Sequence, residues 1–358
     1  MTDPIGGGSL GALVGALLSL FLTLVVGFGG AVSAGGSSTA GSPTTEAVSS
    51  AAAQTGSVRL MVVGDLMLAR GIGTRIANEG VGAPFRKVQP ILDRADLLIG
   101  NLECVVSTRG TQQQKLYTFR AKPRSVGALR SAGFDIVGLA NNHALDYGRV
   151  ALGDTMSNLR SAGIRYMGAG DDLAAARAPV ILVRNGLRVA FLDRADAKLN
   201  SSEWPHLDWE ATAHRRGLAY ARPAELRADV RAARQHADVV VVMLHSGREY
   251  AKGPTKAQRK VVAAALAGGA ALVVSAHPHV LQVATRSGST LAAWSLGNFL
   301  FDGFETIPGA RDSAILDVTL TRDGVARVRW HPVLIRGGFP RPAHGADAAR
   351  ILKRLGAD

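Results

Sequence analysis

The sequence predicts an α/β fold, and three observations support this. From Val58 onward, short apolar runs alternate with amphipathic stretches whose apolar residues recur every three or four positions. The alternation continues without a linker-like break, which favours one domain over residues 58–358, although the length alone would also allow two. Hydrophobic residues make up 47% of the 358 residues and charged residues only 19%, a composition that excludes an intrinsically disordered chain.

The individual elements are expected in the following order. Strands are predicted at 58–63, 96–100, 135–140, 239–244, 270–275, 280–285, 290–296, 313–320 and 324–331. Helices are predicted at 123–132, 149–162, 223–236 and 254–267. The dipeptide Asp323-Gly324 between the last two strands is a hairpin signal.

The N-terminus contains a long apolar segment. Leu10 to Val32 carries no charge over 23 residues, and about 20 apolar residues suffice to cross the hydrocarbon core of a membrane. Small residues after Val32 would also suit a signal peptidase, but a signal core is usually only about 7–15 residues long and follows basic residues. We therefore expect residues 1–34 to be a membrane anchor or a cleaved signal peptide, with the anchor favoured. Either one would place the body of the protein on the extracytoplasmic face of the cell membrane, or outside the cell after cleavage.

Residues 35–57 are small and polar and predict a flexible linker. The chain has 41 basic and 28 acidic residues, and its net charge of +13 would attract anionic partners such as phosphates, envelope polymers or nucleic acid. The arginines are spread along the sequence and aromatic residues reach only 5%, so we expect no nucleic-acid partner. Cys104 is the single cysteine, which excludes an intramolecular disulfide and a cysteine-type zinc site.

Polar residues stand at the carboxyl ends of five predicted strands. In chain order they are Asp65, then Asn101 and Glu103, then Asn141, Asn142 and His143 with Asp146, then His245, and finally His277 and His279. Ligands of open α/β sheets bind beyond the carboxyl ends of the strands, so these groups are expected to converge. Carboxylate, amide oxygen and imidazole together suit one or two divalent ions such as Mn²⁺, Fe or Zn²⁺. The sequence has neither a GxxxxGK[ST] phosphate loop nor a GxSxG serine elbow.

Several segments in the body resemble a known family. They are GDLMLARG, NLECVVST, FRAKPRSVGALRSAGFDIVGLANNHALDYG, HSGREY, HPHVLQ and WSLGNFLFD. In this order they are similar to the CapA family of capsule-biosynthesis proteins, and the resemblance covers residues 58–335. That family is associated with poly-γ-glutamate synthesis and has a metallophosphatase-like fold. The resemblance implies a four-layer α/β/β/α sandwich with the strand-end site at one edge.

The wider calcineurin-like phosphoesterases use the motifs GD-x-H, a second Asp, GNH, a lone His and GHxH. Carried over by position, the resemblance implies Asp65 and His279 on one metal, Glu103 as the bridge, Asn142, His245 and His277 on a second metal, and His143 as the acid that protonates the leaving oxygen.

The sequence departs from the wider pattern at three places. Met67 stands where the first motif has its histidine, so the resemblance implies that the first metal lacks one ligand. Ser246 replaces a tryptophan, and Ser275-Ala276 replaces Gly-His before the last histidine pair. Three further residues near the motif segments are candidate substrate contacts, namely Arg120, Arg248 and Asn298.

The expected function is that of an extracytoplasmic, metal-dependent hydrolase or transferase that synthesises or processes an anionic envelope polymer such as poly-γ-glutamate. The alternative is a non-catalytic component that binds or helps export the polymer, with a structural or degraded metal site. Met67 favours the alternative, whereas His143 favours catalysis. The family context also leads us to expect capsule-synthesis ligase or export subunits as partners.

Overall fold

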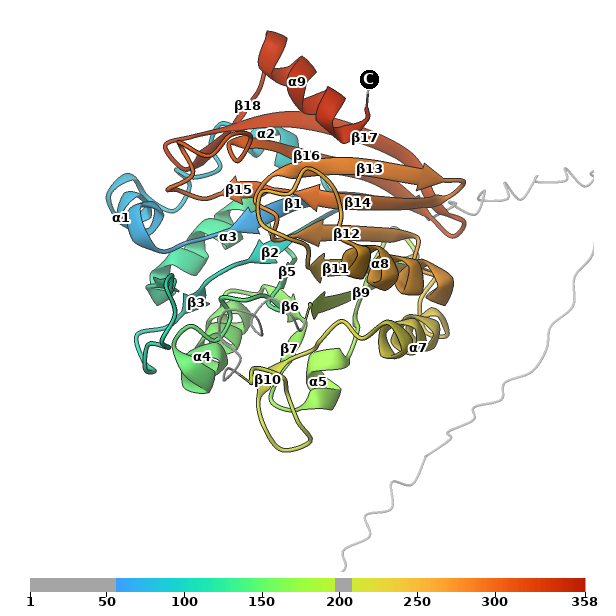
Figure 1. Cartoon of the computed structure of the whole chain (residues 1–358), viewed down its shortest axis with the longest axis horizontal. Coiled ribbons are helices and arrows are strands. Elements are labelled where there is room, and N and C mark those ends of the chain that lie inside the picture. The colour runs from blue at the N-terminus through green and yellow to red at the C-terminus, as the bar shows by residue number, and fades with distance from the viewer. Residues whose placement is uncertain (1–55, 197–207, 358) are drawn as a thin grey trace, which may run out of the picture. The chain divides into compact units, whose positions relative to one another are not determined.

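Two β-sheets packed face to face form the centre of the protein (Figure 1). The computed structural model describes residues 56–196 and 208–357. The predicted anchor or signal at 1–34 and most of the predicted linker lie outside these residues. Among the residues described, no helix is long and apolar enough to cross a membrane.

The first sheet has the order β18-β17-β16-β1-β2-β5-β6, with β15 also paired to β1. Its strands are β1 (Val58–Leu66), β2 (Leu97–Leu102), β5 (Ile136–Gly138), β6 (Arg165–Met167), β15 (Asn298–Leu300), β16 (Asp312–Thr321), β17 (Gly324–Arg336) and β18 (Phe339–Pro342). Strands β1, β2, β5 and β6 run parallel, so their carboxyl ends share one edge.

The second sheet has the order β13-β14-β12-β11-β9-β8. Its strands are β8 (Val180–Arg184), β9 (Leu187–Ala195), β11 (Val239–His245), β12 (Leu272–Ala276), β13 (Leu281–Ser287) and β14 (Thr290–Leu296). Strands β9, β11, β12 and β14 are parallel. Two small ladders complete the strands: β3 (Val105–Val106) with β4 (Arg120–Ala121), and β7 (Ala169–Gly170) with β10 (Gly217–Leu218).

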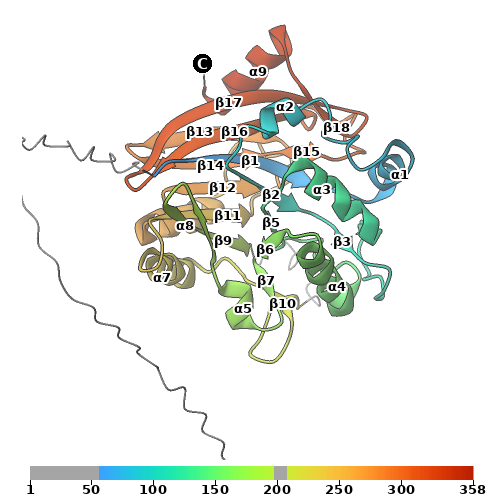
Figure 2. The same ribbon diagram turned by 180° about the vertical axis from the view of Figure 1, so that it is seen from behind.

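Helices cover both outer faces, as the two opposite views show (Figures 1 and 2). The first sheet carries α1 (Arg70–Glu79), α2 (Gln89–Leu92), α3 (Val126–Ala132), which follows the 3₁₀ turn η1 (Pro123–Ser125), and α4 (Gly148–Ser161). The second sheet carries α7 (Pro223–Arg234) and α8 (Lys256–Gly268). The remaining helices are α5 (Leu173–Arg177) and α9 (Gly345–Leu355), and α9 packs on β13 and β17.

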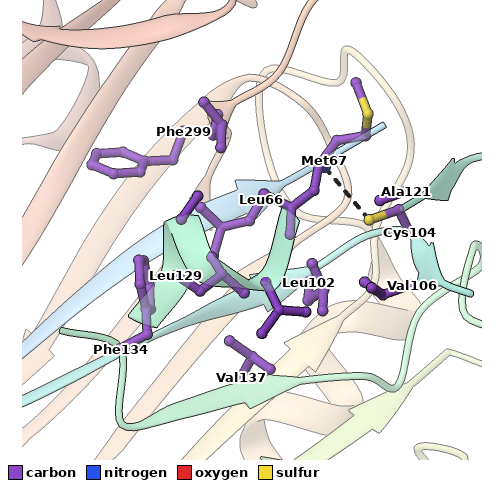
Figure 3. Packing of buried hydrophobic residues seen from close by; sticks show 14 of the residues in the cluster. Leu66, Met67, Leu102, Cys104, Val106, Ala121, Leu129, Phe134, Val137 and Phe299 are labelled. Carbon is purple, nitrogen blue, oxygen red and sulfur yellow. Dashed lines mark hydrogen bonds between the residues drawn. The ribbon is translucent and has the colours of Figure 1, made fainter. Parts of the chain in front are cut away.

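The alternation of side chains along each strand produces this layering. In β1, Leu60 and Val62 point into the core between the sheets, whereas Met61 and Val63 point toward the helices of the first sheet. Strand β11 divides its residues in the same way between the inter-sheet core and α7 and α8. Figure 3 shows part of the core between the first sheet and its helices, in which Leu66 from β1 and Leu129 from α3 both take part. The prediction of a mixed α/β fold is therefore confirmed.

The structure differs from the expected elements at the carboxyl ends of the strands next to the site. Strand β1 continues three residues beyond the prediction, because Asp65 also pairs with Asn101 of β2 and with Asn298 of β15. The strand predicted at 135–140 is shorter and ends at Gly138, because the Ala140 amide donates to the Asp193 carboxylate instead of to a strand. Strands β8 and β9 were absent from the prediction.

Candidate metal centre

The carboxyl ends of the two sheets bring all the predicted metal ligands and His143 into one buried cluster. The first sheet contributes Asp65 from β1, Glu103 just after β2, and Asn142 and His143 after β5. The second sheet contributes His245 at the end of β11, and His277 and His279 just after β12. We call these seven residues the metal-centre cluster. Each of them is at most 8% exposed.

Close backbone packing fixes Asp65. A side chain at Gly64 would place its Cβ only 1.9 Å from the Gly297 carbonyl oxygen, so glycine is required there. The Asp65 amide donates to that same carbonyl at 3.0 Å. The Asp65 carboxylate accepts from the Asn101 side-chain amide at 2.8 Å and from the His277 backbone amide at 3.3 Å, which joins the two sheets at this point.

Glu103 lies between the imidazoles without a donor. Among the described residues, neither of its carboxylate oxygens has a hydrogen-bond partner, although the side chain is fully buried. Its Oε1 is 3.6 Å from His245 Nε2 and 4.0 Å from both His143 Nε2 and His279 Nε2. These distances are too long for hydrogen bonds. They suit oxygen and nitrogen atoms that bind a common ion through bonds of about 2.0–2.2 Å.

The described residues form three groups whose potential ligand atoms lie within 4.8 Å of one another. They are Asp65, Glu103 and His279; Glu103, His245 and His277; and Glu249, His277 and His279. Glu103 belongs to two of these groups, as expected of a bridging carboxylate.

The protonation states suit a divalent ion. Burial lowers the pKa of His279 to about 4 and the pKa values of His245 and His277 well below their ordinary value, so all three rings are neutral ligands at neutral pH. Burial also raises the pKa of Asp65 to about 7, and burial together with the nearby Asp65 carboxylate raises the pKa of Glu103 well above its usual range. A bound cation would favour the ionised form of both carboxylates. The donor set and its buried, unsatisfied carboxylate therefore fit a divalent metal.

Neighbouring amides orient the imidazoles. Asn298 Oδ1 lies 2.8 Å from His279 Nδ1, which leaves Nε2 directed toward Glu103. The Asn298 amide nitrogen donates to the carbonyl oxygens of His279 and Ala310. Asn298 was predicted as a candidate substrate contact, and in the structure it is fully buried, with its polar atoms in contact with His279 and Ala310.

The backbone at the histidine pair is strained. His277 and His279 have φ values of 97° and 58°, in the left-handed region that non-glycine residues rarely adopt. Strain of this kind costs about 1–3 kcal/mol per residue and is concentrated at functional sites.

His143 belongs to a second buried network. Its Nδ1 lies 2.7 Å from Asp146 Oδ2, and Asp146 also accepts from Lys115 Nζ at 2.6 Å and from the Phe119 amide at 2.7 Å. Lys115 Nζ donates further to the Asn142 carbonyl oxygen. Burial lowers the pKa of His143, while the Asp146 carboxylate opposes this effect. The spacing of Asp146 three residues after His143 signals this contact in the sequence, whereas no motif points to Lys115.

The remaining candidates lie outside the cluster. Arg120 is exposed, and its guanidinium lies 4.1 Å from the centre of the Tyr147 ring. It lines a groove of about 380 Å³ together with Arg70, Lys122 and Arg124. Arg248 is exposed on the loop after β11.

Met67 is fully buried in the apolar cluster of Figure 3. Its sulfur accepts from the Ala69 amide at 3.0 Å. Met67 therefore serves the hydrophobic core at the end of β1.

The two packed sheets form a fold similar to that of metallophosphoesterase-like enzymes. A solved structure described as "Putative 5'-Nucleotidase from Staphylococcus aureus" shares this fold, with a TM-score of 0.50 and 14% identity over 84% of this chain and 58% of that one. Residues 59–303 match the family described as "Bacterial capsule synthesis protein PGA_cap", and the chain belongs to this family.

Two relatives support the family assignment. The "Capsule biosynthesis protein CapA" of Bacillus anthracis is 32% identical over 84% of this chain and 73% of the relative. The "PGA biosynthesis protein CapA" of Bacillus subtilis (strain 168) is 31% identical over 78% of this chain and 72% of the relative. The predicted family is thereby confirmed.

Proposed function

We propose that this protein acts in the synthesis or processing of an anionic envelope polymer such as poly-γ-glutamate, as a metal-dependent hydrolase or transferase. The names of the Bacillus relatives support the polymer. The single observation that carries the chemistry is Glu103, a buried carboxylate without a donor among the described residues, within 4.0 Å of three imidazole nitrogens.

The metal-centre cluster divides into ligands and one proton donor. Asp65 and His279 would hold one ion, Asn142, His245 and His277 a second, and Glu103 would be shared between them. When bound, a divalent ion supplies a Lewis acid that polarises a phosphoryl or carbonyl oxygen of the substrate.

His143 is the residue suited to move a proton. Asp146 holds Nδ1 and so keeps Nε2 directed into the cluster, where it lies 4.0 Å from Glu103 Oε1. A proton on Nε2 can pass to the leaving oxygen of the substrate, and the negative charge of Asp146 stabilises the imidazolium needed for this step. Lys115 and the Phe119 amide fix Asp146 in place.

The proposed location is the extracytoplasmic face of the cell membrane. The uncharged segment Leu10 to Val32 supports this, because its length suits a membrane anchor. Protease treatment of intact spheroplasts that express the full chain tests the location. Digestion of the body is expected, and full protection in intact spheroplasts but not in lysed ones would contradict it.

Metal content is the first test of the centre. Purified full-length protein is incubated with Mn²⁺ or Zn²⁺, freed of unbound ions and subjected to elemental analysis. We expect about one or two equivalents of metal, and a large loss in His279→Ala. The matched control is His344→Ala, which changes an exposed histidine before α9 and should retain the metal. Absence of metal from the wild type would contradict the proposal.

Turnover is the second test. The wild type is assayed on a chromogenic phosphodiester and on poly-γ-glutamate, whose chain length is followed by gel filtration. His143→Ala should retain metal but lose at least about 100-fold in rate, the usual contribution of a general acid. Equal rates in both proteins would contradict catalysis. If the metal were retained, they would favour a polymer-binding role. The supporting observation for that role is Met67, which packs in the apolar cluster.

A further inference from the structure

A polar groove of about 810 Å³ begins directly beside the metal-centre cluster. Tyr250 and Val280 line it, and Val280 follows His279 in the chain. Residues 305–309 of the loop before β16, the end of β17 and helix α9 form the rest of its wall. Figure 1 shows α9 lying over β17 on this side of the protein. We call this feature the α9 groove.

The α9 groove carries excess positive charge. Its basic residues are Lys252, Arg311, Arg336, Arg350 and Arg354, and its acidic residues are Glu305, Asp312 and Asp347. Arg350 pairs with both Asp312, at 2.8 Å, and Asp347, at 2.6 Å. Within the described part of the chain, the other four cations have no carboxylate within ion-pair distance. The groove therefore offers four cations and one carboxylate to a ligand.

Two features show that the groove has a defined shape. A side chain at Gly309 would place its Cβ 2.1 Å from an Arg354 guanidinium nitrogen, so Arg354 lies directly against the glycine backbone. Tyr250 has a φ of 60°, and its amide donates to the Pro278 carbonyl oxygen at 2.9 Å. This strained position holds an exposed aromatic ring where the groove meets the histidine pair.

Aromatic contacts connect the groove to the metal ligands. The centre of the Tyr250 ring is 6.4 Å from both the His279 ring and the Phe304 ring, and Phe304 is 4.8 Å from His279. A ligand in the α9 groove would therefore lie next to the Tyr250 ring, which is itself close to His279.

We propose that the α9 groove binds the anionic chain of the substrate and directs it to the metal-centre cluster. This inference rests on the proposed function, because it assigns the polymer of that function to a particular surface. The favoured occupant is a linear polycarboxylate such as poly-γ-glutamate, which carries one carboxylate per repeat and could engage several separate cations in turn. Nucleic acid is the less suitable occupant, since Tyr250 is the only aromatic side chain among the described residues that line the groove, and single-strand binding relies on repeated stacking.

The test measures binding of fluorescently labelled poly-γ-glutamate of defined length to purified full-length protein by anisotropy. The groove variant is Arg311→Gln/Arg336→Gln, which removes two unpaired cations. The matched control is Arg227→Gln/Arg231→Gln, which removes the same charge from two exposed arginines of α7, on the outer face of the second sheet. Thermal unfolding of both variants checks that they are folded.

We expect the dissociation constant of the groove variant to rise by about tenfold or more and its salt dependence to weaken, with less than about a twofold change in the control. Equal weakening in both variants would overturn the inference, because it would show a general charge effect. Failure of the wild type to bind the polymer would also overturn it. So would competition in which single-stranded DNA, compared at the same concentration of negative charge, displaces the labelled polymer more effectively than unlabelled polymer does.

The same samples separate this inference from the proposed function. Metal content and turnover of the small phosphodiester should be unchanged in the groove variant, because that substrate needs only the metal-centre cluster. Selective loss of polymer binding would support the groove even if the wild type proved to hold no metal, in which case only the catalytic proposal would fail.

Discussion

The two sheets meet at the metal-centre cluster but contribute different chemistry to it. The first sheet provides the carboxylates of Asp65 and Glu103, whereas the second provides the imidazoles of His245, His277 and His279. The two ligand groups that include a buried carboxylate each take residues from both sheets, whereas the third group, Glu249, His277 and His279, follows strands of the second sheet and has an exposed carboxylate. The buried carboxylate groups of the centre therefore exist only when the sheets are packed together.

Burial shifts the pKa values of the carboxylates and of the imidazoles in opposite directions. It raises the pKa of the carboxylates and lowers the pKa of the imidazoles, so that both sets favour the neutral form in the absence of a cation. Both buried carboxylates of the ligand groups belong to the first sheet, and a bound cation would favour their ionised form. The carboxylates should consequently control whether metal binds at all, and single imidazoles should control how tightly.

Glu103→Gln should have the largest effect. The substitution keeps the shape of the side chain but removes the charge that two ligand groups share, so we expect metal content below about a tenth of the wild-type value. His277→Ala leaves the group of Asp65, Glu103 and His279 intact and should retain part of the metal. Elemental analysis of both variants measures the difference. A Glu103→Gln protein with full metal content would show that the comparison between the sheets is wrong.

Asp193 of β9 is the exception in the second sheet, and it predicts a pH effect. Its carboxylate lies between the sheets and accepts from the Ala140 amide at 2.8 Å, and burial raises its pKa from 3.8 to about 7. The folded protein thus binds this proton more tightly than the unfolded chain, so the contribution of Asp193 to stability is full below pH 4 and is lost as the pH rises to about 7.

Asp193→Asn removes this titration. The stability advantage of the wild type over the variant should shrink by about 4 kcal/mol between pH 4 and pH 8, the value expected for a pKa difference of about three. Urea unfolding at several pH values measures it. Metal content at pH 7 should remain, because Asp193 belongs to none of the ligand groups. A constant difference across the pH range would contradict the assignment.

Asn298 tests whether the imidazoles need their orienting partners. Asn298→Ala removes the acceptor on His279 Nδ1, and loss of such a contact typically costs about 10–100-fold in metal affinity. Asn298→Asp retains the acceptor on His279 Nδ1 but loses the donor to the carbonyl oxygens of His279 and Ala310, so it should restore part of the affinity, which a merely structural role would not explain. Competition with a metal chelator measures both. Equal affinity in Asn298→Ala and the wild type would remove Asn298 from the centre.

The sequence alone predicted the strand ends of the site well, for a physical reason. A polar residue directly after a buried strand is conspicuous, as at Asp65 and His245, and parallel strands bring such residues to one edge. The resemblance then supplied the layering and the roles that are proposed for the residues of the cluster.

The parts that were not predicted depend on contacts between distant segments. Lys115 lies in a polar loop without a motif, and only the fold brings it to Asp146. Asp193 was missed together with the whole of β9. Asn298 was expected to contact substrate, and nothing in its local sequence indicates that its side chain is buried against His279.

Met67→Leu should have the smallest effect and completes the comparison within the first sheet. Met67 lies two residues after the candidate ligand Asp65, yet its side chain packs in the apolar cluster and its sulfur accepts only from the nearby Ala69 amide among the described residues. Leucine has a similar volume, so the free energy of unfolding should fall by less than about 1.5 kcal/mol, and metal content should not change. Elemental analysis beside Asp65→Asn, which should lose metal, provides the control. Loss of metal in Met67→Leu would mean that the end of β1 supplies the centre with a thioether as well as a carboxylate. The first sheet would then contribute a third kind of ligand, beside its carboxylates and the imidazoles of the second sheet.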